Sequence, residues 1–138
     1  MIMPITNPKM VDDLLPLILA TEDLTYSPHG YLNYIKKALE TEYALLLVNI
    51  NDDNVIDAMA FSETIISITD REAMLNFAFV DKDEKEVGEQ MWNMILEWAK
   101  GMNCKRVCCI TNKLKARAMI RKYGFNDNWA YLTKELGG

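Results

Sequence analysis

The feature that constrains this chain most is a set of three strand-like runs with only short turns between them. The run YALLLVNI (43–50) is followed, after four turn-forming residues, by VIDAMAFS (55–62), and TIISI (64–68) continues that second run. A short turn at 69–71 then leads into EAMLNFAFV (72–80). Strands joined this closely pair with their neighbours in antiparallel fashion, so the sequence predicts a three-stranded meander.

Two helices are predicted ahead of the meander. The first begins at Asn7, a favourable N-cap that is followed by a proline, and it carries an apolar stripe. Pro16 lies inside this stripe, where a proline costs on the order of 3 kcal/mol, so a kink or an early break is expected there. The second helix begins at Ser27, which again precedes a proline, and ends near Glu40.

A helix, a strand, a second helix and a last strand are predicted after the meander. Apolar residues spaced along one helical face run from 87 to 98 and predict a helix that ends before Gly101. The run KRVCCIT (105–111) has the pattern of a buried strand. The end of the chain contains a helix closed by Gly124, since glycine adopts the left-handed conformation of a C-terminal cap, and a strand-like alternating run at 129–136.

With a strand fragment near the N-terminus, the expected order of elements is β-α-α-β-β-β-α-β-α-β, which is a mixed α/β (α+β) fold. The chain has 138 residues, half of them hydrophobic. A chain of this size buries a core of its own without disulfides or metal ions. We therefore expect one domain that spans residues 1–138.

The composition argues against several classes of function. The formal net charge of −5 disfavours nucleic acid as a partner. The sequence has no long apolar stretch and no secretory signal, so the protein is expected in the cytoplasm and not in a membrane. The three cysteines, Cys104, Cys108 and Cys109, are expected to be reduced thiols, and with His29 as the single histidine no metal site is expected.

Two segments carry short motifs. In VDKDEKEVGEQ (80–90), a valine is followed by a lysine and then by a glycine near the start of a predicted helix; these residues are Val80, Lys85 and Gly88. In the segment 116–125, an alanine begins a helix face that ends in a lysine and a Gly-Phe pair; these residues are Ala116, Lys122, Gly124 and Phe125. Together with the order of elements, both motifs resemble the GNAT (N-acetyltransferase) superfamily.

The resemblance implies a mostly antiparallel central sheet flanked by helices, with acetyl-CoA as a co-substrate. The end of the third meander strand would offer backbone groups to the pantetheine, the following helix start would hold the pyrophosphate, and the last helix would lie near the thiol. The residues at the strand end are Phe79 and Val80, those at the helix start are Lys85, Gly88 and Glu89, and those near the thiol are Asn112 and Ala116. Unpaired backbone N–H groups and the helix dipole explain why a helix start holds phosphate.

The chain departs from the family pattern at several positions. Gln90 stands where the loop usually ends in a small residue, and Lys82 stands where a proline is common. Many family members place a tyrosine, the proton donor to the departing thiolate, at the position of Ile120, whereas Tyr123 lies three residues further on. Carboxylates also surround the loop and disfavour phosphate there, although acids in a first helical turn stabilise a helix without any ligand.

Glu63, at the bend of the second meander strand, is the expected catalytic base; its alternative role is that of a solvent-facing strand residue. The expected reaction is acetyl transfer to a primary amine on a small molecule or a protein, and a homodimer stays open. Two other interpretations stay open as well. One is a catalytically degenerate GNAT-fold binding or structural module, for example from a phage. The other is an unrelated α/β domain, which would lack a splay between the strands at 75–80 and 105–111.

Overall fold

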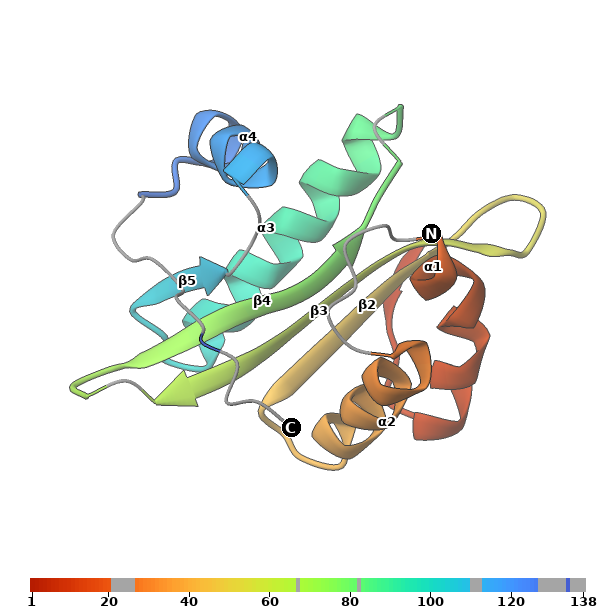
Figure 1. Ribbon diagram of the computed structural model, residues 1–138, viewed down its shortest axis with the longest axis horizontal. Coiled ribbons are helices and arrows are strands. Elements are labelled where there is room, and N and C mark those ends of the chain that lie inside the picture. Colours follow the sequence, from red (N-terminus) through yellow and green to blue (C-terminus); the bar gives the residue numbers. More distant parts are fainter. Residues whose placement is uncertain (21–26, 67, 82, 110–112, 127–133, 135–138) are drawn as a thin grey trace.

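The predicted meander lies at the centre of a five-stranded sheet (Figure 1). Figure 1 shows the computed structural model, which describes residues 1–20, 27–66, 68–81, 83–109, 113–126 and 134. The strands are β1 (Ile2–Pro4), β2 (Ala44–Ile50), β3 (Ile56–Ile66), β4 (Arg71–Phe79) and β5 (Arg106–Cys109). They lie in the order β1-β2-β3-β4-β5, and all neighbours are antiparallel except β4 and β5, which are parallel. The expected mixed, mostly antiparallel sheet is confirmed.

Local signals in the sequence set most of the helix ends. The helical elements are the 3-10 helix η1 (Pro8–Leu14), α1 (Leu15–Leu19), α2 (Pro28–Leu39), α3 (Lys85–Gly101) and α4 (Lys113–Tyr123). As predicted, Asn7 and Ser27 are N-caps, and their side chains accept hydrogen bonds from the backbone N–H groups of Lys9 (3.0 Å) and Gly30 (3.1 Å). Gly124 follows α4 with a left-handed φ of +72°, as its capping role requires. No helix in the described ranges is long and apolar enough to cross a membrane.

Three boundaries differ from the sequence prediction. The break expected at Pro16 falls just before it, because α1 begins one residue ahead of the proline. Pro16 thus occupies the first helical turn, where its N–H would have no partner in any case. α3 runs one residue further than predicted, since Gly101 is its last residue. β5 is shorter than the predicted strand 105–111, and residues 110–111 and all of 129–136 except Lys134 lie outside the described residues.

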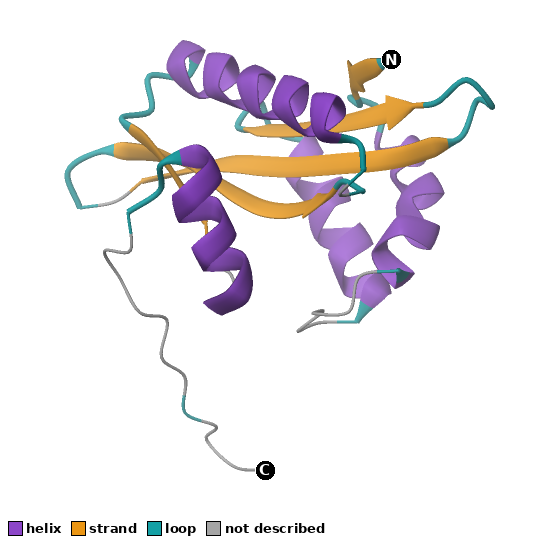
Figure 2. Cartoon of the chain, turned by 90° about the horizontal axis from the view of Figure 1, so that it is seen from above, coloured by secondary structure: helices purple, strands orange, loops and turns teal. Residues whose placement is uncertain are grey.

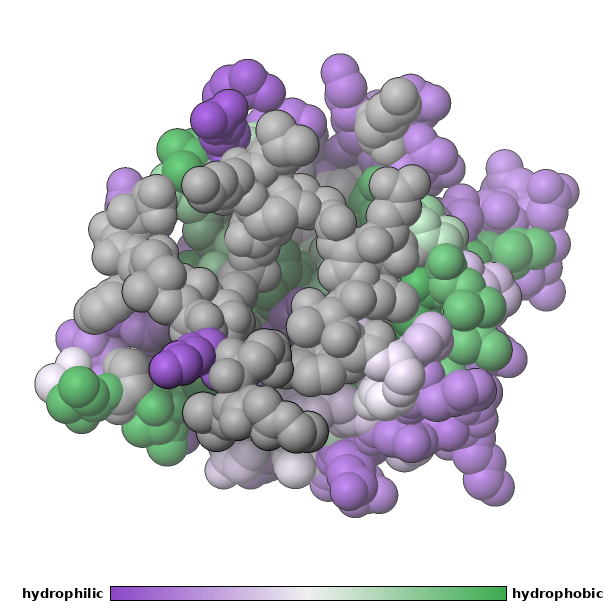
Figure 3. Space-filling model, in the orientation of Figure 1, coloured by the Kyte–Doolittle hydropathy of each residue, from purple (hydrophilic) through white to green (hydrophobic). Residues whose placement is uncertain are grey.

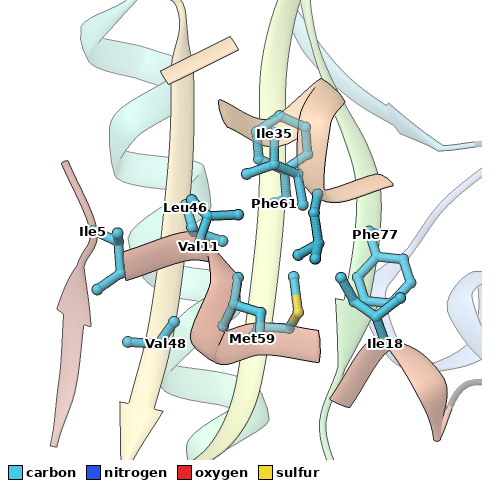
Figure 4. Close-up of a cluster of buried hydrophobic side chains, with 11 residues drawn as sticks. Ile5, Val11, Ile18, Ile35, Leu46, Val48, Met59, Phe61 and Phe77 are labelled. Atoms are coloured by element: carbon cyan, nitrogen blue, oxygen red, sulfur yellow. The ribbon is translucent and has the colours of Figure 1, made fainter. Parts of the chain in front are cut away.

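Helices cover both faces of the sheet (Figure 2). The elements η1, α1 and α2 lie on one face and α3 lies on the other. Because successive side chains of a strand point to opposite faces, adjacent residues of β2 enter different cores. On the α2 face the buried strand residues, all of them labelled in Figure 4, are Leu46, Val48, Met59, Phe61 and Phe77. On the α3 face, Met91 and Ile95 of the helix pack on Leu47, Ala58 and Ala60.

β4 carries one extra residue in its pairing with β3. The β4 partners of successive β3 residues jump from Phe77 to Leu75, so Asn76 is left over as a β-bulge. The parallel pairing of β4 with β5 stops at the same point, because its last pair is Leu75 with Cys109. Beyond this pair, β4 stays paired with β3 to its end, but no described strand lies on its other edge. The described pairing of β4 with β5 therefore ends at the bulge.

Candidate functional site

A cavity of about 500 Å³ lies on the α3 face of the sheet, where β4 leaves β5. Its volume falls within the range of small-molecule sites. Leu75, Ala78 and Val80 contribute the sheet side of the cavity. The first turns of α3 form one wall, and the end of α4, with Lys122 and Tyr123, forms another. The cavity thus begins at the strand separation and extends to the start of α3.

The first turn of α3 borders this cavity with Lys85, Gly88 and Glu89. The first backbone N–H groups of an α-helix have no partner within the helix. The N-cap residue, Glu84, makes no side-chain capping hydrogen bond, and its carbonyl accepts the N–H of Gly88 at 3.2 Å. A helix start with free N–H groups beside a cavity is a favourable place for a phosphate.

Gly88 is not explained by backbone conformation or by packing. Its φ is not in the left-handed region, so an L-residue would adopt the same backbone. A Cβ at this position would lie 3.6 Å from Val80 Cγ1, which is ordinary van der Waals contact. The effect of the glycine is therefore to leave room in the cavity beside the α3 backbone.

Charges of both signs border the cavity. Lys85 and Lys122 line it, and so do Asp81 and Glu84. Partial desolvation and the neighbouring carboxylates, Asp57 first among them, raise the pKa of Glu84. The carboxylates weaken the attraction of this helix start for a phosphate, whereas the two lysines strengthen it.

Aromatic contacts hold the end of α4 against α3. The rings of Tyr123 and Phe125 lie on the ring of Trp92, with centroids 5.1 and 5.4 Å apart. Phe125 is half-buried and reaches this helix by turning back after Gly124. Ile120 is 40% exposed, and it is Tyr123 that borders the cavity.

Glu63 lies near the bulge and faces α2. Its Oε1 accepts hydrogen bonds from the hydroxyl of Tyr34, on α2, and from Nδ2 of Asn76 at 2.7 Å. Partial burial, together with the hydrogen bond and the charge of Glu63, raises the pKa of Tyr34 to about 12. The hydroxyl therefore stays protonated and remains a donor to the carboxylate. The expected base thus sits beside the strand separation, on the face opposite the cavity.

Four of the predicted cofactor residues line the same cavity; they are Val80, Lys85, Gly88 and Glu89. Phe79 ends β4, and its side chain packs toward the core on the α2 face. Asn112 lies outside the described residues, and for Ala116 only the backbone, within α4, is described. Trp92 lines the cavity but was missed, because in the sequence it falls within an ordinary amphipathic helix.

The cysteines do not carry the chemistry of this site. All three are free thiols. Partial burial raises the pKa of each, and for Cys108 burial and the neighbouring Glu72 raise it to about 12. Thiols that stay protonated are poor nucleophiles. Among the described residues, no group of three or more His, Cys, Asp or Glu side chains could hold a metal ion.

The fold is shared with solved acetyltransferases. The aminoglycoside 6'-N-acetyltransferase AAC(6')-Ih from Acinetobacter baumannii superposes with a TM-score of 0.77 at 20% identity, with 99% of both chains covered. A predicted acetyltransferase with acetyl-CoA from Clostridium acetobutylicum gives 0.75 at 17%, with 96% of both chains covered. The aminoglycoside N-acetyltransferase AAC(6')-Iy, in complex with CoA, gives 0.78 at 12%, covering 98% of this chain and 93% of that one.

At the level of sequence, the chain matches no family model and no curated protein. With identities this low, the structural matches establish the fold and not the activity. The chain therefore has the fold of the GNAT N-acetyltransferases, and the resemblance seen in its motifs is confirmed at that level. The interpretation as an α/β domain of unrelated fold is not supported, because the fold is shared with these acetyltransferases over nearly the whole chain.

Proposed function

We propose that this protein is an acetyl-CoA-dependent N-acetyltransferase that acts on a primary amine. The observation that carries the proposal is the cavity at the separation of β4 and β5, bordered by the start of α3 with Gly88 facing it. A glycine that neither conformation nor packing requires, beside free helix N–H groups, suits a ligand that must approach the backbone closely.

The residues around the cavity fit the parts of acetyl-CoA. The start of α3 would hold the pyrophosphate through backbone N–H groups, and Lys85 and Lys122 would add positive charge. The free edge of β4 after the bulge, up to Phe79 and Val80, would pair with the amides of the pantetheine. Acetyl-CoA would supply an acetyl group activated as a thioester.

Glu63 is our candidate for the base that removes a proton from the amine. Its carboxylate is half-buried beside the point where β4 and β5 separate. The cavity approaches that point from the α3 face and Glu63 approaches it from the α2 face, so the two substrates would meet at the open edge of β4. Tyr123 borders the cavity, but its contact with Trp92 gives it a packing role first.

Two observations favour a second candidate, a GNAT-fold module that binds without catalysis. Ile120 stands at the family's tyrosine position, so the usual proton donor to the thiolate is missing there. Asp81 and Glu84 border the cavity and oppose phosphate binding. A module of this kind would still bind CoA but would release no free thiol from acetyl-CoA.

Calorimetric titration with CoA and with acetyl-CoA separates these candidates, followed by a thiol-release assay with acetyl-CoA. The amines to test are kanamycin, spermidine, lysine and a lysine-containing peptide, because an aminoglycoside, a polyamine, an amino acid and a protein side chain all remain as acceptors. Binding with amine-dependent thiol release supports the enzyme. Binding of CoA without release with any of these amines favours the module, and no binding of CoA contradicts both.

A further inference from the structure

We propose that Tyr34 and Asn76 are positioning residues that hold one oxygen of Glu63, so that its other oxygen is presented to the protonated amine of the acceptor. The inference rests on the proposed function and extends it to residues that neither the motifs nor the cavity identified. It assigns the amine subsite to the α2 face of the sheet, next to the bulge of β4.

Both hydrogen bonds to the Glu63 carboxylate end on the same atom. Oε1 accepts from the Tyr34 hydroxyl and from Asn76 Nδ2, the latter at 2.7 Å. Within the described part of the chain, no hydrogen bond ends on Oε2. Glu63 as a whole is half-buried. A carboxylate held through one oxygen has a fixed direction and an unused acceptor, which is what binding of an ammonium group needs.

Asn76, the extra residue of the bulge, lies beside this carboxylate. Asn76 bonds to Glu63, and the next residue, Phe77, pairs with Phe61 and packs against Tyr31 with ring centroids 5.6 Å apart. Two successive residues of β4 therefore face α2, which regular alternation would not allow.

Asn76 bonds to Glu63 through its side-chain nitrogen, and its side-chain oxygen makes no bond to the described residues. Oδ1 of Asn76 is buried and has no hydrogen-bond partner among the residues that the structure describes. Native proteins rarely leave a buried acceptor unpaired, and the exceptions call for an explanation. A leucine would fill this position without an unpaired polar atom. The asparagine is better explained by what it does for Glu63 than by packing.

Tyr34 holds the same oxygen from the helix side. Its ring meets Phe61 edge-on, with centroids 6.1 Å apart and an angle of 87°, although half of the residue is exposed. With a pKa of about 12, its hydroxyl donates to Glu63 throughout the range in which the protein would work. On the face of the molecule shown in Figure 3, hydrophilic residues gather along the lower right.

In the reaction, Oε2 of Glu63 takes one proton from the ammonium group of the acceptor. The freed lone pair on nitrogen forms a C–N bond to the thioester carbonyl carbon, and the C–S bond breaks with its electron pair leaving on sulfur. A second proton leaves the nitrogen and completes the free thiol of CoA. Glu63 then returns its proton to water, so that the enzyme regains its starting state.

The test compares Tyr34→Phe, Asn76→Leu and Glu63→Gln, with Tyr43→Phe as a matched loss of a tyrosine hydroxyl that does not touch Glu63. The readouts are the Kd of CoA, the unfolding temperature, and kcat/KM for whichever of the four amines gives the fastest thiol release. We expect Glu63→Gln to lower kcat/KM about a hundredfold or more. Tyr34→Phe and Asn76→Leu should each lower it about fivefold to tenfold, because each loses one bond to a charged group. The Kd of CoA should stay unchanged in all four variants.

Two further measurements separate a positioning role from a structural one. In the Glu63→Gln background, Tyr34→Phe should have little additional effect, since both changes act through the same carboxylate. Asn76→Leu should not lower the unfolding temperature, because it removes a buried unpaired oxygen. Unchanged kcat/KM in Tyr34→Phe, or additive losses in the double variant, would overturn the inference while leaving the acetyltransferase intact. A protein that fails to bind CoA or to release thiol would instead overturn the proposed function and this inference with it.

Discussion

Replacing Gly88 with alanine should move the stability of the fold and the affinity for CoA in opposite directions. The glycine lies in the first turns of α3 and borders the cavity. Its backbone is helical, and an added Cβ would meet only Val80 Cγ1 at 3.6 Å. The fold therefore accepts a methyl group at this position, whereas a ligand lying against the backbone would not.

The gain in stability follows from helix propensity. Alanine is favoured over glycine inside a helix by about 0.5–1 kcal/mol, chiefly because it restricts the unfolded chain. For a domain of this size, that difference raises the unfolding temperature by about 2–5 °C. Gly101→Ala is the matched control, since Gly101 ends the same helix and an added Cβ there would meet nothing within 4 Å. Gly101→Ala should therefore raise the unfolding temperature as well.

The loss in affinity follows from the space that the methyl group takes from the ligand. Overfilling a well-packed contact costs about 1–3 kcal/mol. With a factor of ten for every 1.4 kcal/mol, the Kd of CoA should rise about fivefold to hundredfold in Gly88→Ala. Gly88→Val adds two more carbons on the same side and should abolish detectable binding while the protein still folds.

Thermal unfolding without ligand and calorimetric titration with CoA measure the two effects on the same preparations. The expected pattern is a higher unfolding temperature and weaker binding for Gly88→Ala, with wild-type binding for Gly101→Ala. If Gly88→Ala binds CoA as tightly as Gly101→Ala does, the start of α3 is not part of the binding site. A lower unfolding temperature for Gly88→Ala would refute the packing argument instead.

Three further outcomes are expected. Tyr123→Phe keeps the ring on Trp92 and should lower the rate of acetyl transfer by far less than the roughly hundredfold loss expected for a true general acid. Ile120→Tyr should raise this rate if the new hydroxyl reaches the thiol. A larger loss in Tyr123→Phe, with unchanged affinity for CoA, would identify Tyr123 as the acid. Glu84→Gln removes a negative charge beside the cavity and should lower the Kd of CoA about twofold to fivefold at low ionic strength, and less at high salt. An effect that does not change with salt would contradict repulsion between this carboxylate and the phosphates. Because the pKa of Cys108 is raised to about 12, iodoacetamide should alkylate this thiol at pH 8 at least about a hundredfold more slowly in the folded protein than in the unfolded chain. The thiol ionises from about pH 9 in the unfolded chain, so the contribution of Cys108 to the stability of the fold should disappear as the pH rises toward 12.

The elements that the sequence predicted well are those determined by short-range physics. Asn7 and Ser27 each precede a proline and accept a backbone N–H, so the start of a helix is decided within four residues. Gly124 closes α4 for an equally local reason, its left-handed φ. The meander was predictable because turn-forming residues separate runs of strand-forming ones, as at 51–54.

The wall between α3 and α4 depends on contacts between distant parts of the chain. Trp92 lies in α3 but is not one of the spaced apolar residues from which the helix was predicted. Its partners, Tyr123 and Phe125, lie some thirty residues later, at the end of another helix. Nothing in either segment indicates that the two helices approach each other at this point. The sequence motif therefore predicted residues on the α3 side of the cavity, but the contact that forms the wall between α3 and α4 was missed.

The environment of Glu63 was beyond sequence analysis for a different reason, which is register. A single extra residue in β4 lets both Asn76 and Phe77 face α2, although side chains otherwise alternate along a strand. Neither Asn76 nor its neighbours carries a local bulge signal such as a glycine. The bulge is instead fixed by both ends of the β3–β4 pairing, where Met59 pairs with Phe79 and Ile66 with Arg71. These pairings place the extra residue where the described part of β5 ends, so a single irregularity in β4 lies next to both the cavity and Glu63, the proposed base.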